Sequence, residues 1–123
     1  MLANSLDPVV RCVNRALVEL GHGERTAAEI RPIIGPPTEI GFGGLLGLPP
    51  ESKAVARAVK AYRALYVDGL WDTPSYPGIV DVVFTLAETR RLAVATSKPL
   101  VYANPVVEAL GLTDAFDVVV GPE

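Results

Sequence analysis

The chain has few of the residues on which chemistry in proteins often depends. Its 123 residues include one cysteine and one histidine. A single cysteine, Cys12, excludes an internal disulfide and any metal site built from several cysteines. Cys12 lies on the apolar face of a predicted helix, where a buried and inert thiol is expected. The only histidine, His22, follows a helix-ending glycine, and we predict a surface position for it rather than a catalytic one.

Long apolar runs and basic runs are absent as well. No run approaches membrane-spanning length, and the first ten residues have neither the basic nor the apolar region of a secretory signal. The chain has 11 basic and 14 acidic residues, a net charge of −3. This balance argues against nucleic acid and anionic membranes as partners. We therefore expect a cytoplasmic protein that binds neither.

The first half of the chain has apolar residues at helical spacing. Asp7 and Pro8 predict a helix start, with Asp7 as the N-cap and Pro8 in the first helical position. Residues 26–29 have the pattern of a capping box for a short second helix. Further helices are expected over 38–46, despite three glycines, and over 51–67. We interpret the basic residues of the last helix as a solvated face rather than a binding patch.

The second half alternates between helix and strand. After a linker over 68–75, the pattern predicts helices over 79–89 and near 100–110, and strands over 92–95 and 116–120. A helix between two apolar strands is typical of a right-handed βαβ unit with parallel strands. Within the second of these helices, Asn104 and Pro105 predict either a late start capped by Asn104 or a kink.

The strongest candidate for a site is the segment 92–99, Leu-Ala-Val-Ala-Thr-Ser-Lys-Pro. Its apolar part is typical of a buried parallel strand covered on both faces, and it stops at Thr96, Ser97 and Lys98. Ligands bind beyond the carboxyl ends of such strands, and hydroxyls, backbone N–H groups and one compact cation suit a phosphoryl group. Thr96 and Ser97 could equally be N-cap residues of the following helix, and the residues alone leave both readings open.

Several short motifs, in a fixed order, carry a family resemblance. They are Ser-Leu-Asp-Pro (5–8), Val-Asn-Arg-Ala-Leu-Val-Glu-Leu-Gly-His (13–22), Ile-Arg-Pro-Ile-Ile-Gly-Pro-Pro (30–37), Tyr-Pro-Gly-Ile (76–79), Ala-Val-Ala-Thr-Ser-Lys-Pro (93–99) and Phe-Asp-Val-Val-Val-Gly-Pro-Glu (116–123). The set resembles a phosphoglycolate-phosphatase-type member of the haloacid dehalogenase superfamily. The resemblance implies an α/β protein: a helical cap domain over 8–70, followed over 76–123 by part of a Rossmann-like parallel sheet whose first core strand is missing.

The same resemblance implies which residues would form the site. It places phosphate binding on the hydroxyl of Thr96, on a backbone N–H at Ser97 and on the positive charge of Lys98. In this family, one stretch of the cap faces the active site and helps to select the substrate. The resemblance places four residues of this chain in that stretch: Arg31, Gly35, Pro36 and Pro37. Arg31 could instead be a solvated side chain of the cap.

One motif of the family has no counterpart. The family's first strand ends in Asp-x-Asp-x-Thr, whose first aspartate attacks phosphorus and whose second acts as general acid and base. The aspartates of this chain are each isolated, and none follows an apolar run in that pattern. The family's later lysine and acidic motif are not found either. We therefore expect a fragment truncated at both ends, inactive by itself, to which the family's Mg²⁺ does not bind.

These observations predict a function for the complete parent and a rival for the chain itself. The resemblance implies that the parent hydrolyses a small phosphate monoester, such as phosphoglycolate, through an aspartyl-phosphate with Mg²⁺. The rival is a non-catalytic remnant that binds a phosphate-bearing ligand or a protein partner through the cap and the Thr96 loop. In either case we expect the strand over 92–95 to present an apolar edge through which the chain self-associates.

Overall fold

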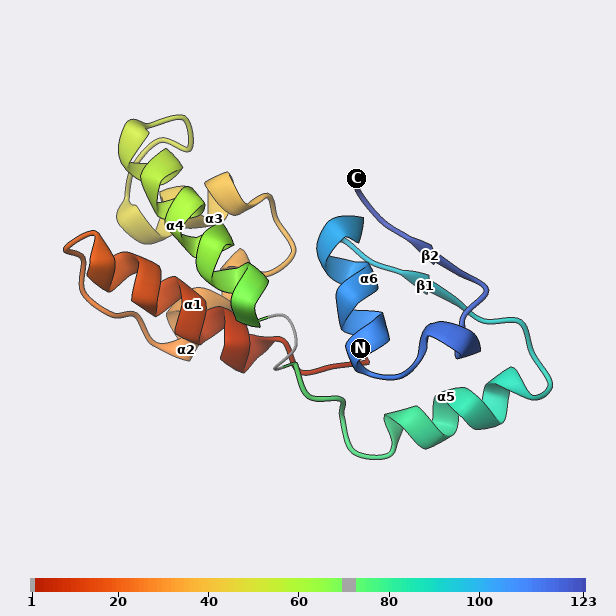
Figure 1. The fold of residues 1–123 in the computed structure, drawn as a ribbon. Coiled ribbons are helices and arrows are strands. Elements are labelled where there is room, and N and C mark those ends of the chain that lie inside the picture. The colour runs from red at the N-terminus through yellow and green to blue at the C-terminus, as the bar shows by residue number, and fades with distance from the viewer. Residues whose placement is uncertain (1, 70–72) are drawn as a thin grey trace. The chain divides into compact units, whose positions relative to one another are not determined.

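The computed structural model describes residues 2–69 and 73–123, and the chain forms two compact units (Figure 1). Residues 5–69 form one unit, here called the helical unit. Residues 1–4 and 70–123 form the other, here called the α/β unit. The N-terminal segment belongs to the α/β unit through backbone pairing: Asn4 N–H donates to Pro74 O at 2.8 Å and Tyr76 N–H to Leu2 O at 3.2 Å.

The first helix, α1, spans Leu6–Glu19 and begins one residue before the predicted cap. The N-cap residue is Ser5, which makes no side-chain capping hydrogen bond, so the prediction of Asp7 as N-cap was wrong. Asp7 instead lies in the first turn, where the positive end of the helix dipole stabilises a carboxylate. Pro8 fits there because N–H groups of the first turn need no intrahelical partner. The apolar face is buried as the spacing predicts: Val9, Cys12, Val13, Ala16 and Leu17.

The capping box at Thr26 is confirmed. In α2 (Ala27–Ile30), the Glu29 N–H donates to Thr26 Oγ1 at 3.3 Å, and the Thr26 N–H donates to Glu29 Oε2 at 2.7 Å. The Thr26 backbone N–H favours the charged carboxylate and lowers the pKa of Glu29. The stabilisation is therefore present above the ordinary carboxyl pKa and is lost as the pH falls through the lowered value. A 3₁₀ turn over Arg31–Ile33 follows.

Three glycines in α3 (Thr38–Leu46) do not prevent this helix, because two of them allow close packing. A Cβ placed on Gly41 would lie 2.7 Å from Ile33 Cβ, and one on Gly43 would lie 2.9 Å from Leu48 O. A Cβ on Gly44 would meet no atom within 4 Å. Gly41 and Gly43 have low helix propensity, but they let the neighbouring chain pack closely against the helix. Gly44 has the same low propensity without such a contact.

This difference predicts opposite effects for the same substitution three residues apart. Gly41→Ala is expected to destabilise the helical unit by about 1–3 kcal/mol, since Ile33 must move to admit the methyl group. Gly44→Ala, the matched control, is expected to stabilise it by about 0.5–1 kcal/mol. Denaturant unfolding of both variants measures the difference, and equal shifts in the free energy of unfolding would contradict the packing at Gly41.

The longest helix, α4, spans Lys53–Gly69 and packs against α1 and α3. It starts two residues later than predicted and ends two residues later, so Asp68 and Gly69 belong to the helix and not to the expected linker. Residues 70–72 of that linker lie outside the described residues. The basic side chains are exposed, which confirms a solvated face, and Arg63 forms an ion pair with Glu39 of α3 at 3.0 Å.

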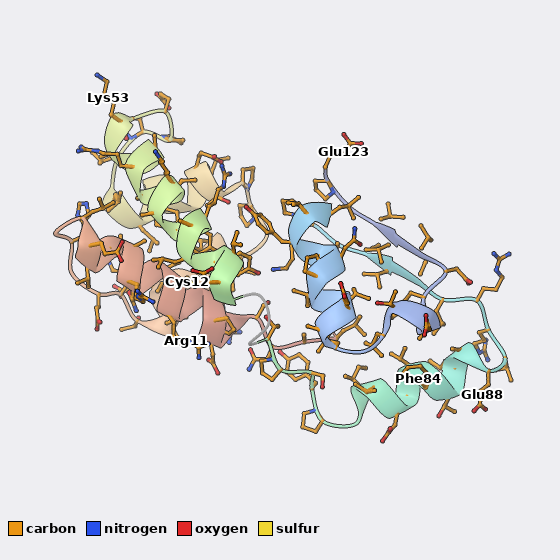
Figure 2. The ribbon with its side chains drawn as sticks, in the orientation of Figure 1. Arg11, Cys12, Lys53, Phe84, Glu88 and Glu123 are labelled. Carbon is orange, nitrogen blue, oxygen red and sulfur yellow. The ribbon has the colours of Figure 1, made fainter. Side chains whose placement is uncertain are left out.

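The βαβ arrangement of the second half is confirmed. The α/β unit contains α5 (Ile79–Ala87), β1 (Ala93–Ala95), α6 (Leu100–Ala109), a 3₁₀ turn over Thr113–Ala115, and β2 (Val118–Val120). The two strands lie side by side (Figure 1) and are parallel. Val94 pairs with Val119 in this register. A core cluster forms around them from Val83, Val107, Leu112 and Ala115. Glu123 lies beyond β2, Phe84 lies on α5, and Glu88 follows the last residue of that helix (Figure 2).

The strands are less buried than their apolar sequence predicts. In both strands only the middle residue is half-buried, while Val118 and Val120 remain 50% and 57% exposed. The expectation of a strand covered on both faces was wrong, because within the described residues the sheet has two strands and its core packs on one side. One edge of each strand and one apolar face are therefore open.

Of the two possibilities expected from Asn104 and Pro105, the late start of the helix does not occur. The helix α6 starts at Leu100 and continues through Pro105 to Ala109, so the late start capped by Asn104 was wrong. Pro105 lies in the second turn and cannot donate to a carbonyl four residues earlier. Burial of Val106 and Val107 immediately after it offsets this lost hydrogen bond, and tertiary packing carries the helix past the proline.

Candidate phosphate-binding site

The predicted site residues form a compact turn at the carboxyl end of β1. The Thr96 N–H donates to Val120 O at 3.0 Å, which extends the pairing with β2 by one residue. The chain then turns, and the Lys98 N–H donates to Thr96 Oγ1 at 3.0 Å. A threonine hydroxyl that accepts from the backbone two residues ahead is typical of a side-chain-stabilised turn. Thr96, Ser97 and Lys98 are thus brought together, and we call them the Thr96 turn.

Two donors of the turn make no hydrogen bond within the described residues. A hydroxyl carries one donor and two acceptor lone pairs, and the Lys98 N–H occupies only an acceptor position of Thr96. The Ser97 N–H makes no hydrogen bond within the described parts of the chain, and Ser97 is exposed. The O–H of Thr96 and the N–H of Ser97 are therefore both available to donate to a ligand.

Lys98 adds a cation whose charge is partly desolvated. Its side chain is half-buried, and burial lowers the pKa of the ammonium group below the ordinary value for lysine. Desolvation disfavours the charged form, and a bound anion would offset that cost. Two donors beside one partly desolvated cation form an arrangement that can bind phosphate.

The alternative role of Thr96 and Ser97 as helix caps is wrong. The N-cap residue of α6 is Pro99, and no side chain caps this helix. The hydroxyl of Thr96 serves the turn before the helix instead. Helix capping therefore does not explain why two hydroxyl residues, Thr96 and Ser97, follow each other here.

The predicted specificity residues lie together in sequence but not around one cavity. An open cleft of about 420 Å³ in the helical unit is lined by Pro36, whereas Arg31 and Gly35 are not among its lining residues. Arg31 is exposed at the start of the 3₁₀ turn, and Gly35 has a φ of +111°, which requires glycine. The cleft is otherwise lined by Arg25, Glu29, Pro32, Ile33, Ile40, Gly41, Gly44 and Leu45.

Arg25 at this cleft was missed in the sequence. Its backbone is fixed by the Asn14 side chain, which accepts from the Arg25 N–H at 2.8 Å and donates to the Arg25 carbonyl at 2.9 Å. Its guanidinium also reaches Leu45 O at 3.5 Å. The partners are 11 and 20 residues away along the chain, so no local pattern could have identified this arginine.

Groups that could hold a metal or act as a nucleophile are scarce. Across residues 2–69 and 73–123, no three His, Cys, Asp or Glu side chains are grouped as metal ligands. Cys12 is buried, which raises the pKa of its thiol, and His22 is half-buried rather than fully on the surface. The described residues therefore offer no group of side chains that fits a Mg²⁺ site.

The whole chain matches a family model. Residues 1–123 match the haloacid dehalogenase-like hydrolase model, and the chain therefore belongs to that family. It is 35% identical over 126 residues to the probable phosphatase IndB of Dickeya dadantii and 32% identical over 125 residues to the phosphoglycolate phosphatase of Nitrosospira multiformis. The matches cover 99% and 97% of this chain but 55% of each relative, so the chain spans about half the length of the curated relatives it matches.

Solved structures show the same fold. A haloacid dehalogenase-like hydrolase of Streptococcus pneumoniae matches 99% of this chain and 57% of its own, with a TM-score of 0.87 and 27% identity. The structure named protein tyrosine kinase A of Mycobacterium tuberculosis matches 100% of this chain and 56% of its own, with a TM-score of 0.81 and 28% identity. A helical cap with part of a parallel sheet is thus confirmed as the fold class. Because proteins named hydrolase and kinase share it, the fold alone does not choose the reaction.

Proposed function

We propose that the Thr96 turn is the phosphoryl-binding part of a phosphatase that hydrolyses a small phosphate monoester. The observation that carries the proposal is the hydrogen bond from the Lys98 N–H to Thr96 Oγ1, which leaves the hydroxyl proton and the Ser97 N–H available to an anion. Membership of the hydrolase family and similarity to proteins named phosphatase support this reaction class. Similarity to proteins named phosphoglycolate phosphatase favours a small phosphorylated acid as the substrate.

The residues of the turn would act by electrostatic stabilisation. The Thr96 hydroxyl and the Ser97 N–H would donate to phosphoryl oxygens, and Lys98 would balance their charge as it shifts during transfer. The family's carboxylate chemistry and its Mg²⁺ are not assigned to any residue of this chain. We propose Arg31, Gly35 and Pro36 as residues that contact the part of the substrate beyond the phosphate. The helical unit would then act as the cap and the α/β unit as the core, in the cytoplasm.

Binding of inorganic phosphate tests this function directly. Thr96→Val removes the hydroxyl at nearly constant shape, and hydrogen bonds to charged groups contribute about 1.5–3 kcal/mol. We therefore expect at least about a tenfold weaker affinity, measured from amide chemical shifts of Ser97 during a phosphate titration. Thr85→Val, the same change at an exposed position of α5, is the matched control and should leave the affinity unchanged.

The same samples separate binding from hydrolysis. With Mg²⁺ and a simple aryl phosphate, we expect the chain of 123 residues to bind phosphate without turning the ester over. Measurable Mg²⁺-dependent turnover would contradict the assignment of binding alone to these residues. A wild-type chain whose Ser97 amide does not respond to phosphate would contradict the site itself.

The open sheet leads to a second expectation, self-association of the isolated chain. Val118 and Val120 expose half or more of their surface, and one edge of β1 has no strand partner within the described residues. Two strands are too few to be stable alone, and an apolar edge pairs readily with another chain. Sedimentation velocity at micromolar concentration should show dimers or larger species, and Val118→Lys should shift them towards monomer. A monomer that unfolds cooperatively would contradict this expectation.

A further inference from the structure

The chain that follows β2 runs directly along the Thr96 turn. Two backbone hydrogen bonds join them: the Thr96 N–H donates to Val120 O at 3.0 Å, and the Leu100 N–H donates to Pro122 O at 2.7 Å. The first bond is made by the first residue of the turn, and the other by Leu100, two residues after it. The residue between the two acceptors is Gly121, so this glycine lies opposite the turn.

Gly121 allows an unusually close approach. A Cβ placed on it would lie 3.0 Å from Thr96 O, 3.0 Å from Lys98 O and 3.0 Å from Thr96 Cγ2. Real Cβ atoms rarely come so close to another atom, and two of these three are backbone oxygens that cannot rotate away. Gly121 is not among the glycines with positive φ, so glycine is required here for space rather than for backbone conformation.

We propose that Gly121 is the positioning residue of the Thr96 turn, an inference that rests on the proposed phosphate-binding function. The missing side chain lets residues 120–122 hold both ends of the turn by backbone hydrogen bonds. The turn so held directs the Thr96 hydroxyl and the Ser97 N–H to one side. A methyl group at position 121 pushes the turn away, and the two donors no longer converge on one anion.

The test is Gly121→Ala in the full chain. A shift of a few tenths of an ångström is expected to weaken binding of inorganic phosphate by about tenfold, since a misplacement near 1 Å can cost about a hundredfold. The amide signals of Ser97, Lys98 and Leu100 are expected to move even without phosphate. Val83→Ala, which removes buried carbon from α5 in the same unit, is the control for lost stability and should leave the affinity unchanged below its melting temperature.

A second variant keeps the test decisive if Gly121→Ala folds poorly. Thr96→Ser retains the hydroxyl but lacks Cγ2, one of the three atoms that the new methyl group meets. The double variant Gly121→Ala/Thr96→Ser should therefore recover part of the turn geometry and of the affinity, which a double-mutant cycle measures. Additive effects in that cycle would overturn the inference.

The outcomes also separate this inference from the proposed function. If wild-type protein does not bind phosphate but Gly121→Ala moves the amide signals of the turn, the positioning role stands and the phosphate function fails. If wild-type protein binds phosphate and Gly121→Ala binds it equally well with unmoved signals, the phosphate function stands and the positioning role fails.

Discussion

Phe42→Ala is expected to destabilise the helical unit by about 3–5 kcal/mol. The Phe42 side chain is fully buried between α3 and α4, and its ring lies 5.5 Å from that of Tyr62 at an angle of 55°. Stability of about 0.1 kcal/mol per residue gives a unit of this size roughly 6 kcal/mol in total. The substitution therefore removes most of it and lowers the melting temperature of this unit by roughly 20 °C.

Phe84→Ala provides the matched control for that experiment. Phe84 lies on α5 and is 42% exposed, so its truncation should change the free energy of unfolding by no more than about 0.5 kcal/mol (Figure 2). Hydrogen exchange followed by mass spectrometry distinguishes the units. Peptides of α1 and α4 should lose protection in Phe42→Ala, and peptides of α6 should keep it. Equal loss of protection throughout the chain would show that the two units unfold as one.

Local sequence patterns were sufficient where the local chain decides the structure. The capping box at Thr26 uses neighbours three residues apart, and it is present as expected. The order of helices and strands in the α/β unit follows from apolar periodicity, and the parallel pairing follows from the helix between the strands. The family resemblance likewise rested on an ordered series of short motifs, and the family is confirmed.

The errors arose where distant parts of the chain decide the structure. A late start of α6 at Asn104 was one of two possibilities expected, but the helix begins at Leu100 and continues past Pro105, where the next two valines are buried. The apolar strands were expected to be buried on both faces, yet burial depends on which elements cover them and not on their own composition. The close approach of Gly121 was not predicted from its place in the motif 116–123, because it involves residues more than 20 positions earlier. The roles of Thr96, Ser97 and Lys98 stay predictions until binding is measured.

Leu112→Ala is expected to have the corresponding effect on the α/β unit. Leu112 is fully buried in the cluster that joins α5, α6 and β2, and truncation of such a leucine costs about 2–5 kcal/mol. The described part of the α/β unit has two strands and so little stability to lose, and we expect a large fraction of the unit to unfold at 25 °C. Thermal unfolding followed by circular dichroism measures the loss. Leu86→Ala, at a 39% exposed position of α5, is the matched control and should stay close to wild type.

The pair Phe42→Ala and Leu112→Ala also locates the phosphate response within the chain. The Thr96 turn is held by backbone hydrogen bonds to residues 120 and 122, all within the α/β unit. Leu112→Ala should therefore abolish the response of the Ser97 amide to phosphate as the unit unfolds. Phe42→Ala should leave that response in place even at temperatures where the helical unit has melted. The opposite pattern would mean that phosphate binds in the helical unit, with its cleft beside Arg25 as the next candidate.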